Sequence, residues 1–416
     1  MIQQANQEAL TRLKRASPRL VDIRRAGDVL EGFDRSTILH AGPPIDYPQM
    51  CAPMQEAVHA VLIYEGLAEN RDAAAKLAAS GKIRYLTCHE RGVVGPMTGV
   101  TSYSMPLLVV RNETYGNLAF STINEGAGDV IRFGGCTDNT IRRLKWIETV
   151  LAPRLKQAVD LLGGLDLSAI MSQALSMGDE LHMRNIAASM VLLHRLAAPL
   201  SQVCPPEELR EIMTFLTSRN DQFFLNFAMA ANKSAADAAE GVPNSTLVTA
   251  IARNGVEVGI RVSGMPGRWF TAPAPLVKGL YFSGYSEEDA NPDLGDSAIM
   301  EVNGFGAFAM AASPAIVRLI GIPDTDEANE FTQLMRAITV GEHQNYTIPG
   351  QNFAGLPLGI DLMKVVDTGI EPGLNTAIVS KQPGVGMIGA GLSRVPFAAF
   401  AKALIAFDEM IRERGE

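Results

Sequence analysis

Apolar residues recur every three or four positions in the middle of the chain, which is the spacing of one helix face. The clearest stripe comprises Leu144, Ile147, Leu151, Leu155, Val159 and Leu162. Helical spacing continues through residues 168–200 and 207–240, with breaks at residues 163–164 and 204–206. Pro153 is expected to kink the first helix or to start a second one. The pattern therefore predicts a helical middle domain over residues 141–243.

Shorter helix and strand patterns alternate before this helical section. Residues 3–16 are predicted to form a surface helix, and residues 54–80 two helices, the second capped by Asn70. Short apolar runs at residues 20–23, 37–40 and 83–87 are typical of strands. These elements predict an N-terminal α/β domain over residues 1–140.

The last section opens with a hairpin pattern. Residues 247–253 and 256–263 flank Asn254-Gly255, which favours a type I′ turn with two positive φ angles. Further strands are expected at 268–272 and 278–283, a small-residue helix from Asn303 to Ala312, and a closing helix after Pro396. Because strands and helices mix without regular βαβ alternation, the fold class is predicted as multidomain α+β, with a third domain over residues 244–416.

Composition and charge narrow the function classes. The 416 residues include 36 basic and 45 acidic side chains, a net charge of −9. This argues against a nucleic-acid backbone or an anionic membrane as partner, because both attract clustered Lys and Arg. The four cysteines form no CxxC pair, so neither a zinc knuckle nor a disulfide framework is predicted. With a polar N-terminus and no long apolar run, we expect a cytoplasmic protein, and we assign no metal or cofactor.

Residues 88–135 carry the densest candidate chemistry, because polar side chains punctuated by glycines lie between predicted strands. His89 and Glu90 are the candidate catalytic residues, since an imidazole titrates near neutrality. The candidate substrate-binding residues of this stretch are Arg91, Thr98, Thr101, Ser102, Glu125 and Arg132. The stretch does not name a reaction by itself.

Turns in the C-terminal section extend this candidate site. Arg268 follows a predicted turn, and Asp296 and Ser297 precede an apolar stretch. Asn303 is predicted to cap a helix whose glycines allow close ligand approach, and close helix packing explains the same glycines equally well. We expect the stretch 88–135 to meet the turns near Arg268 and Asp296 and to form an anion-binding cleft with them.

Three other motifs favour structural interpretations. Residues 179–185 predict a helix capped by Asp179 with a Glu180–Arg184 ion pair on its surface. Gln222, Asn226, Lys233 and Asp237 share one arc of a helix, which favours a solvent face over a polar stripe lining a cleft. The GxGxxG pattern at 384–389 lacks a following βαβ unit and therefore favours a tight turn over a phosphate-holding turn.

Eight segments occur together in matching order and spacing between about residues 20 and 400. As a set they resemble the YlbE/AllG family of bacterial proteins. The segments are residues 39–44, 95–99, 124–126, 177–180, 221–226, 268–273, 290–293 and 295–298.

This resemblance implies a subunit of an oxamate carbamoyltransferase in anaerobic allantoin and purine catabolism. The reaction exchanges oxalurate plus phosphate for carbamoyl phosphate plus oxamate. The resemblance also implies partner subunits similar to FdrA, itself similar to acyl-CoA synthetases, and to AllH, and it leaves a homo-oligomer open. Two alternatives remain: a non-catalytic scaffold for the FdrA-like enzyme, and a stand-alone enzyme acting on a small carboxylic acid or amide. The Ser-x-Arg-Thr phosphate signature of other carbamoyltransferases is absent, so the chemistry requires a different scaffold.

Overall fold

A five-stranded sheet in the order β4-β6-β5-β1-β7 forms one layer of the computed structural model, which describes residues 1–218 and 220–414. Its strands are β1 Pro18–Arg25, β4 Val93–Val94, β5 Pro106–Asn112, β6 Leu118–Thr122 and β7 Leu165–Asp166. β4 lies parallel to β6, and the other neighbours are antiparallel. Beside it, β2 Thr37–His40 pairs in parallel with β3 Arg84–Thr87.

The C-terminal section builds three antiparallel sheets. The first contains β8 Val248–Asn254, β9 Glu257–Val262, β10 Phe270–Pro273 and β12 Leu294–Gly295. The second contains β11 Lys278–Tyr281, β15 Gly373–Val379 and β16 Met387–Arg394. The third pairs β13 Thr339–Ile348 with β14 Ala354–Ile360. Strands and helices are therefore mixed without βαβ repetition, and the predicted α+β fold class is confirmed.

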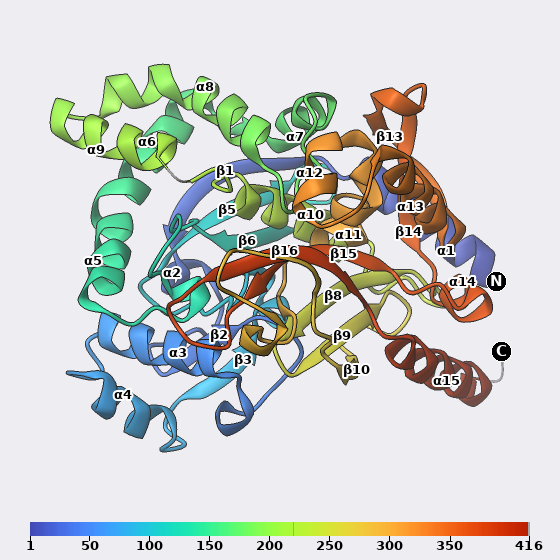
Figure 1. The fold of residues 1–416 in the computed structure, drawn as a ribbon, viewed down its shortest axis with the longest axis horizontal. Helices are drawn as coiled ribbons and strands as arrows, with labels where there is room; N and C mark the ends of the chain where they lie inside the picture. The colour runs from blue at the N-terminus through green and yellow to red at the C-terminus, as the bar shows by residue number, and fades with distance from the viewer. Residues whose placement is uncertain (219, 415–416) are drawn as a thin grey trace.

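Helices cover these sheets and separate them (Figure 1). The helices before residue 140 are α1 Ile2–Arg15, α2 Ala26–Val29, α3 Ala52–Tyr64, α4 Arg71–Ala78 and the start of α5 Asp138–Trp146. Those of the middle section are α6 Ala152–Leu162, α7 Leu167–Ser176, α8 Ile186–Val203, α9 Pro206–Thr217 and α10 Leu225–Ala238. The last are α11 Ile299–Val302, α12 Pro314–Leu319, α13 Thr325–Ala337, α14 Leu362–Thr368 and α15 Phe397–Arg414.

The apolar stripe from Leu144 to Leu162 spans three successive helical segments, and Pro153 lies where the last of them begins. α5 passes through a π-helical segment, η4 Ile147–Leu151, into α6, where Pro153 stands in the first turn. Proline lacks the N–H that an interior turn needs, so the first turn of a new helix is where it fits. Among the described residues, α8 alone is long and apolar enough to cross a membrane by length and composition, and it contacts α6 and α7.

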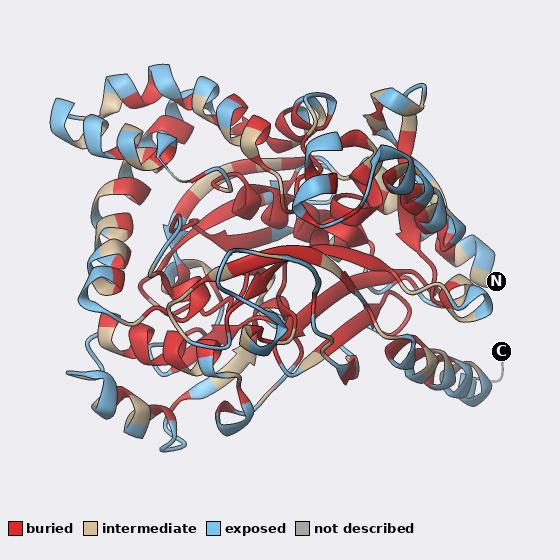
Figure 2. Cartoon of the chain, viewed as in Figure 1, coloured by how far each residue is buried: buried red, intermediate tan, exposed pale blue. Residues whose placement is uncertain are grey.

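Helix α10 occupies the centre of the molecule. It packs against β4, β5 and β6 of the first sheet and against α11 on another side. Figure 2 shows this central region buried, while the outer turns of α4, α9 and α15 are exposed. The predicted solvent face on α10 is therefore wrong: Asn226 and Lys233 are buried, because sheet and helix cover the faces that carry them.

The predicted hairpin forms, but its turn differs from the prediction. β8 and β9 pair antiparallel around Gly255, which has φ +79°. Asn254 ends β8 and does not adopt the predicted positive φ; instead its side-chain Oδ1 accepts the N–H groups of Val256 and Glu257, at 3.0 and 2.7 Å. An asparagine side chain that satisfies the turn replaces the predicted backbone geometry.

Two other local predictions have opposite outcomes. Residues 380–386 join β15 to β16, with a turn at 383–384, so the tight turn is confirmed for the first part of the segment, while residues 387–389 begin β16. Asn303 does not cap a following helix, because it ends α11, and its amide donates to the carbonyls of Asn232 and Ile299. A 3-10 helix, η6 Gly306–Ala312, follows in place of the expected helix.

Candidate active site

Asp296 joins the N-terminal and C-terminal parts of the chain. It lies between β12 and α11 and is fully buried. Its carboxylate accepts the backbone N–H groups of Gly42, at 2.8 Å, and Gly95, at 3.1 Å. A side chain does not fit at Gly42, because a Cβ there would lie 2.5 Å from the Asn254 nitrogen. Burial raises the pKa of Asp296 to about 7, although both N–H groups favour its ionised form.

His89 lies in the 3-10 turn η2 Cys88–Arg91 and faces this carboxylate. Its Nε2 is 3.6 Å from Asp296 Oδ1, which is too long for a hydrogen bond. Trp269 presents a ring edge-on at a centroid distance of 5.4 Å. Burial, followed by the charges of Lys233 and Arg261, holds the pKa of His89 well below its usual range. The imidazole is therefore neutral near pH 7.

Two buried cations complete this region. Lys233 of α10 is 2% exposed and pairs with Asp237, while Arg253 of β8 is fully buried. Arg253 donates to the Gly295 carbonyl at 2.7 Å and pairs with Asp293 at 3.1 Å. A buried cation is costly unless anions or acceptors surround it. We call His89, Lys233, Arg253 and Asp296 the polar centre.

The other predicted residues of the C-terminal turns lie at different depths. Ser297 is buried, and its Oγ lies 3.5 Å from an Arg253 nitrogen. Arg268 is exposed and stacks over Phe270 at 5.2 Å. In the N-terminal stretch Glu90 is exposed and Arg91 half-buried. The structure thus brings Asp296 and Ser297 to the polar centre, and it places Arg268, Glu90 and Arg91 nearer the surface.

The three predicted hydroxyls are buried and already donate to the protein. Thr98 donates to the Ile131 carbonyl at 3.0 Å, and Thr101 to the Gly99 carbonyl at 3.2 Å. Ser102 donates to Glu65 at 2.7 Å. To bind a phosphoryl or carbonyl oxygen as donors, each would have to give up that bond.

Arg132 and Glu125 line a small cavity together with Thr98, Asn124 and Asn226. Its volume of about 10 Å³ is roughly the room that one water molecule needs. Arg132 donates to the Gly126 carbonyl at 2.8 Å, and its buried Nε has no hydrogen-bond partner within residues 1–218 and 220–414. Burial lowers the pKa of Arg132 to about 10 and raises that of Glu125 to about 7.

An open cleft lies on the other side of the same loop. It has a volume of about 680 Å³ and is lined by Gly126, Arg143, Trp146 and Phe215, among others. Arg143, which lines the cleft, donates to the Glu125 carbonyl at 2.8 Å. Arg132, which lines the cavity, donates to the next carbonyl, that of Gly126. The cleft therefore reaches the wall of the Arg132 cavity.

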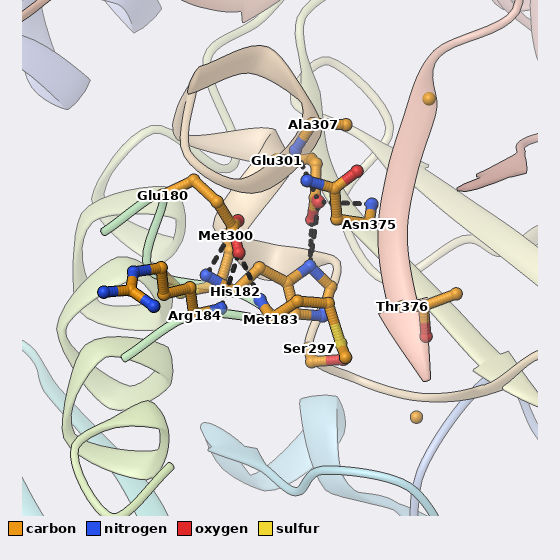
Figure 3. A network of polar contacts seen from close by, with 12 residues as sticks. Glu180, His182, Met183, Arg184, Ser297, Met300, Glu301, Ala307, Asn375 and Thr376 are labelled. Carbon is orange, nitrogen blue, oxygen red and sulfur yellow. Dashed lines mark hydrogen bonds and ion pairs between the residues drawn. The ribbon is translucent and has the colours of Figure 1, made fainter. Parts of the chain in front are cut away.

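A second imidazole–carboxylate pair consists of His182 and Glu301, a residue of α11 (Figure 3). His182 Nδ1 is 2.8 and 2.9 Å from the two Glu301 oxygens. Glu301 also accepts the backbone N–H groups of Ala307 and Asn375, both at 3.1 Å. Gly306 packs against this carboxylate so closely that a Cβ would lie 2.0 Å from Oε1. We call His182 and Glu301 the His182 pair.

The loop that presents His182 corrects the prediction for residues 179–185. These residues form no helix; Glu180 folds its carboxylate back onto the N–H groups of His182, Met183 and Arg184. The ion pair is Asp179–Arg184, at 3.1 Å, rather than Glu180–Arg184. Asp179 instead accepts the Ala188 N–H at the start of α8. Burial raises the pKa of Glu180 to about 7.

Several buried polar atoms around these groups lack partners. We call a buried polar atom open when it has no hydrogen-bond partner among the residues that the structure describes. Both nitrogens of His89, Nε2 of His182, the Trp269 nitrogen and both amide atoms of Asn375 are open. Folded proteins satisfy nearly all such atoms, so a cluster of open ones marks a place for a ligand or water.

Sequence reasoning missed Lys233, His182 and Glu301 as site residues. A signal was present for two of them: Lys233 belongs to the polar arc on α10, and His182 to the segment 179–185, in which five of the seven residues are polar or ionisable. Among the described residues, no group of three or more His, Cys, Asp and Glu side chains is arranged to hold a metal ion.

Both the family model and a full-length relative that match this chain cover the region of the polar centre. The family model for oxamate carbamoyltransferase subunit AllG matches residues 83–297, which include both His89 and Asp296. The chain is 42% identical to oxamate carbamoyltransferase subunit AllG of Escherichia coli K12 over 411 residues, covering 98% of each chain. The chain belongs to the AllG family.

Two further likenesses cover nearly the whole chain. The uncharacterized protein YahG of Escherichia coli K12 is 47% identical over 406 residues, which are 97% of this chain and 86% of YahG. A crystal structure of a conserved protein of unknown function from Enterococcus faecalis V583 superimposes with a TM-score of 0.96 at 47% identity, covering 98% of both chains. The fold is thus shared with a solved protein.

Proposed function

We propose that this chain is a subunit of a carbamoyltransferase that moves a carbamoyl group between oxamate and phosphate, and that the polar centre holds the substrates. The observation that carries the proposal is the cluster of open imidazole nitrogens and buried cations around Asp296. Membership of the AllG family supplies the reaction class. A buried site rich in donors and cations suits a reaction between two anions.

The exchange needs cations and one proton carrier. A phosphate oxygen forms a bond to the carbamoyl carbon of oxalurate, and the bond from that carbon to the oxamate nitrogen breaks. The proton lost by phosphate goes to that nitrogen, so oxamate leaves as a neutral amide with its carboxylate intact. Carbamoyl phosphate is the other product, and no oxidant or metal is needed to balance the step.

Residues of this chain match these needs. We assign Lys233, whose charge lowers the pKa values of both His89 and Asp296, to attract the phosphate. Arg132, with its open Nε, is suited to the acceptor carboxylate. A histidine carries the proton between phosphate and amide nitrogen. The FdrA-like and AllH-like subunits are the proposed partners, because the AllG protein of Escherichia coli is named as a subunit.

The test is oxalurate phosphorolysis by the chain reconstituted with its FdrA-like and AllH-like partners. Lys233→Met keeps the side-chain volume, and its partner Asp237 already has a side chain that is 22% exposed to water, so the fold is expected to survive. We expect kcat/KM for phosphate to fall by about 10- to 100-fold, the loss of one or two charge-assisted contacts. Lys76→Met, at an exposed position on α4, is the matched control and should change nothing.

Other outcomes separate the rival functions. Absence of phosphorolysis in the complete complex would reject the proposed reaction. Full activity of the Lys233→Met complex, together with loss of activity when the chain is left out, would identify a non-catalytic scaffold. Turnover by the isolated chain on a small carboxylic acid or amide would identify a stand-alone enzyme.

A further inference from the structure

The His182 pair has the construction of an oriented base. An ionised Glu301 carboxylate can only accept, so a His182 ring that holds a single proton holds it on Nδ1, the nitrogen that faces Glu301. The lone pair is then on Nε2, which is open. Glu301 is held in turn by two backbone N–H groups, from Ala307 and Asn375. A base fixed by a third group in this way is the general pattern of proton-transferring histidines.

The surroundings of the His182 ring are buried and largely polar. In Figure 3 Glu301 and Asn375 lie above the His182 ring, and Ser297 lies below it, with Thr376 to one side. Both side-chain atoms of Asn375 are also open. Ser297 and Thr376 each lie within 3.5 Å of an Arg253 nitrogen, at 3.5 and 3.2 Å, so the His182 pair borders the polar centre through them.

His89 lacks this construction although it also faces a carboxylate. Asp296 directs both oxygens to the backbone N–H groups of Gly42 and Gly95 and stands 3.6 Å from the ring. Both nitrogens of His89 are open, so nothing within the described chain selects its tautomer. A ring free to donate with one nitrogen and accept with the other is suited to binding a ligand.

We propose that His182, with Nε2 as the reacting atom and Glu301 as its anchor, carries the proton in the carbamoyl exchange, and that His89 binds the substrate by hydrogen bonds. The proposal rests on the proposed function. As the phosphate oxygen bonds to the carbamoyl carbon, its proton passes to Nε2 of His182. The same proton then passes from Nε2 to the oxamate nitrogen as the carbon–nitrogen bond breaks. The imidazolium exists only between these transfers, stabilised by Glu301.

The experiment compares three histidine variants in the reconstituted complex. His182→Asn keeps an N–H near the position of Nδ1, which preserves the bond to Glu301, and removes Nε2. We expect its kcat for oxalurate phosphorolysis to fall by at least about 100-fold, with KM changed little. His89→Asn should mainly raise KM. His194→Asn, at an exposed position on α8, is the control and should match the wild type.

A second measurement does not depend on activity. Imidazole nitrogen NMR of the full chain should show His182 protonated on Nδ1 and unprotonated on Nε2, and His182→Asn should remove that signal. An unchanged kcat in a folded His182→Asn complex would overturn the role of His182 while leaving the carbamoyl exchange intact. A ring protonated on Nε2 would overturn it even in a complex without phosphorolysis, where the proposed function itself has failed.

Discussion

The pairs His89–Asp296 and His182–Glu301 contain the same kinds of group, and they differ in the hydrogen bonds that the carboxylate accepts. Asp296 binds two backbone N–H groups from distant segments and leaves His89 at 3.6 Å. Glu301 directs both oxygens to Nδ1 of His182. Glu301 also accepts two backbone N–H groups, on Oε1. Both carboxylates therefore fasten segments of the chain together, and only the second also orients a ring. The residue types alone do not distinguish these roles, because the remaining partners of each oxygen decide them.

The largest expected effect is that of Glu301→Gln. Oε1 accepts the two backbone N–H groups, so the amide oxygen should take that place and the amide NH2 should face Nδ1 of His182. The amide oxygen stays 2.8 Å from Nδ1, but the NH2 group beside it replaces the second acceptor by a donor, which disfavours a proton on Nδ1 and loosens the orientation of the ring. We expect kcat to fall by about 100-fold or more, with little change in KM or melting temperature.

Steady-state kinetics with thermal denaturation of the same sample checks this prediction. A variant that loses stability and activity together would show that Glu301 is a structural carboxylate like Asp296, and the contrast between the two pairs would disappear.

Asp296→Asn should act on stability instead. An amide has one acceptor oxygen where the carboxylate has two, so either Gly42 or Gly95 loses its partner, at a cost of about 1–3 kcal/mol in unfolding free energy. The measurement is chemical denaturation at pH 7, with Asp22→Asn, a half-buried carboxyl on β1, as a control for the substitution itself. A change below that of the control would contradict the fastening role.

The same variant should change the pH dependence of stability. The folded pKa of Asp296 is about 7, above its unfolded value of roughly 3.9. The folded state then holds the proton more tightly, so this group's contribution to stability is lost as pH rises from about 4 to about 7. Asp296→Asn should reduce that slope by up to ~1.4 kcal/mol per pH unit, while Glu125 and Glu180 keep their own contributions. An unchanged slope would contradict the raised pKa.

The smallest expected effect is that of Trp269→Phe beside His89. Phenylalanine keeps the ring edge against the imidazole and removes the open indole nitrogen and part of the contact with Arg261. We expect stability to change by less than about 1 kcal/mol, within the range of one cation–π contact. Catalysis should change little, because no orienting bond of His89 is lost. A large fall in kcat would show that Trp269 orients His89, which would then resemble the His182 pair.

Local sequence determined the elements of this protein well. Asn70 caps α4 by accepting the Ala73 N–H, and the helix after Pro396 forms as its apolar stripe predicts. The hairpin β8–β9 and the strand that leads to His89 also lie where short-range patterns place them. Eight short segments were sufficient to indicate the family, which the comparisons show. These features depend on neighbours within a few residues, whose chemistry is visible in the chain.

Only the tertiary structure decided the site. Residues 179–185 have a helical signature, but Glu180 binds three following N–H groups and presents His182 to Glu301, which lies 119 residues away. In the sequence, Lys233 has the spacing of a solvent-exposed helix face. In the structure it is buried, because the first sheet and α11 cover its helix. Asp296 meets Gly95 across 201 residues. A carboxylate has the same local pattern whether it faces water or a buried ring, and burial by distant segments determines which of the two it becomes.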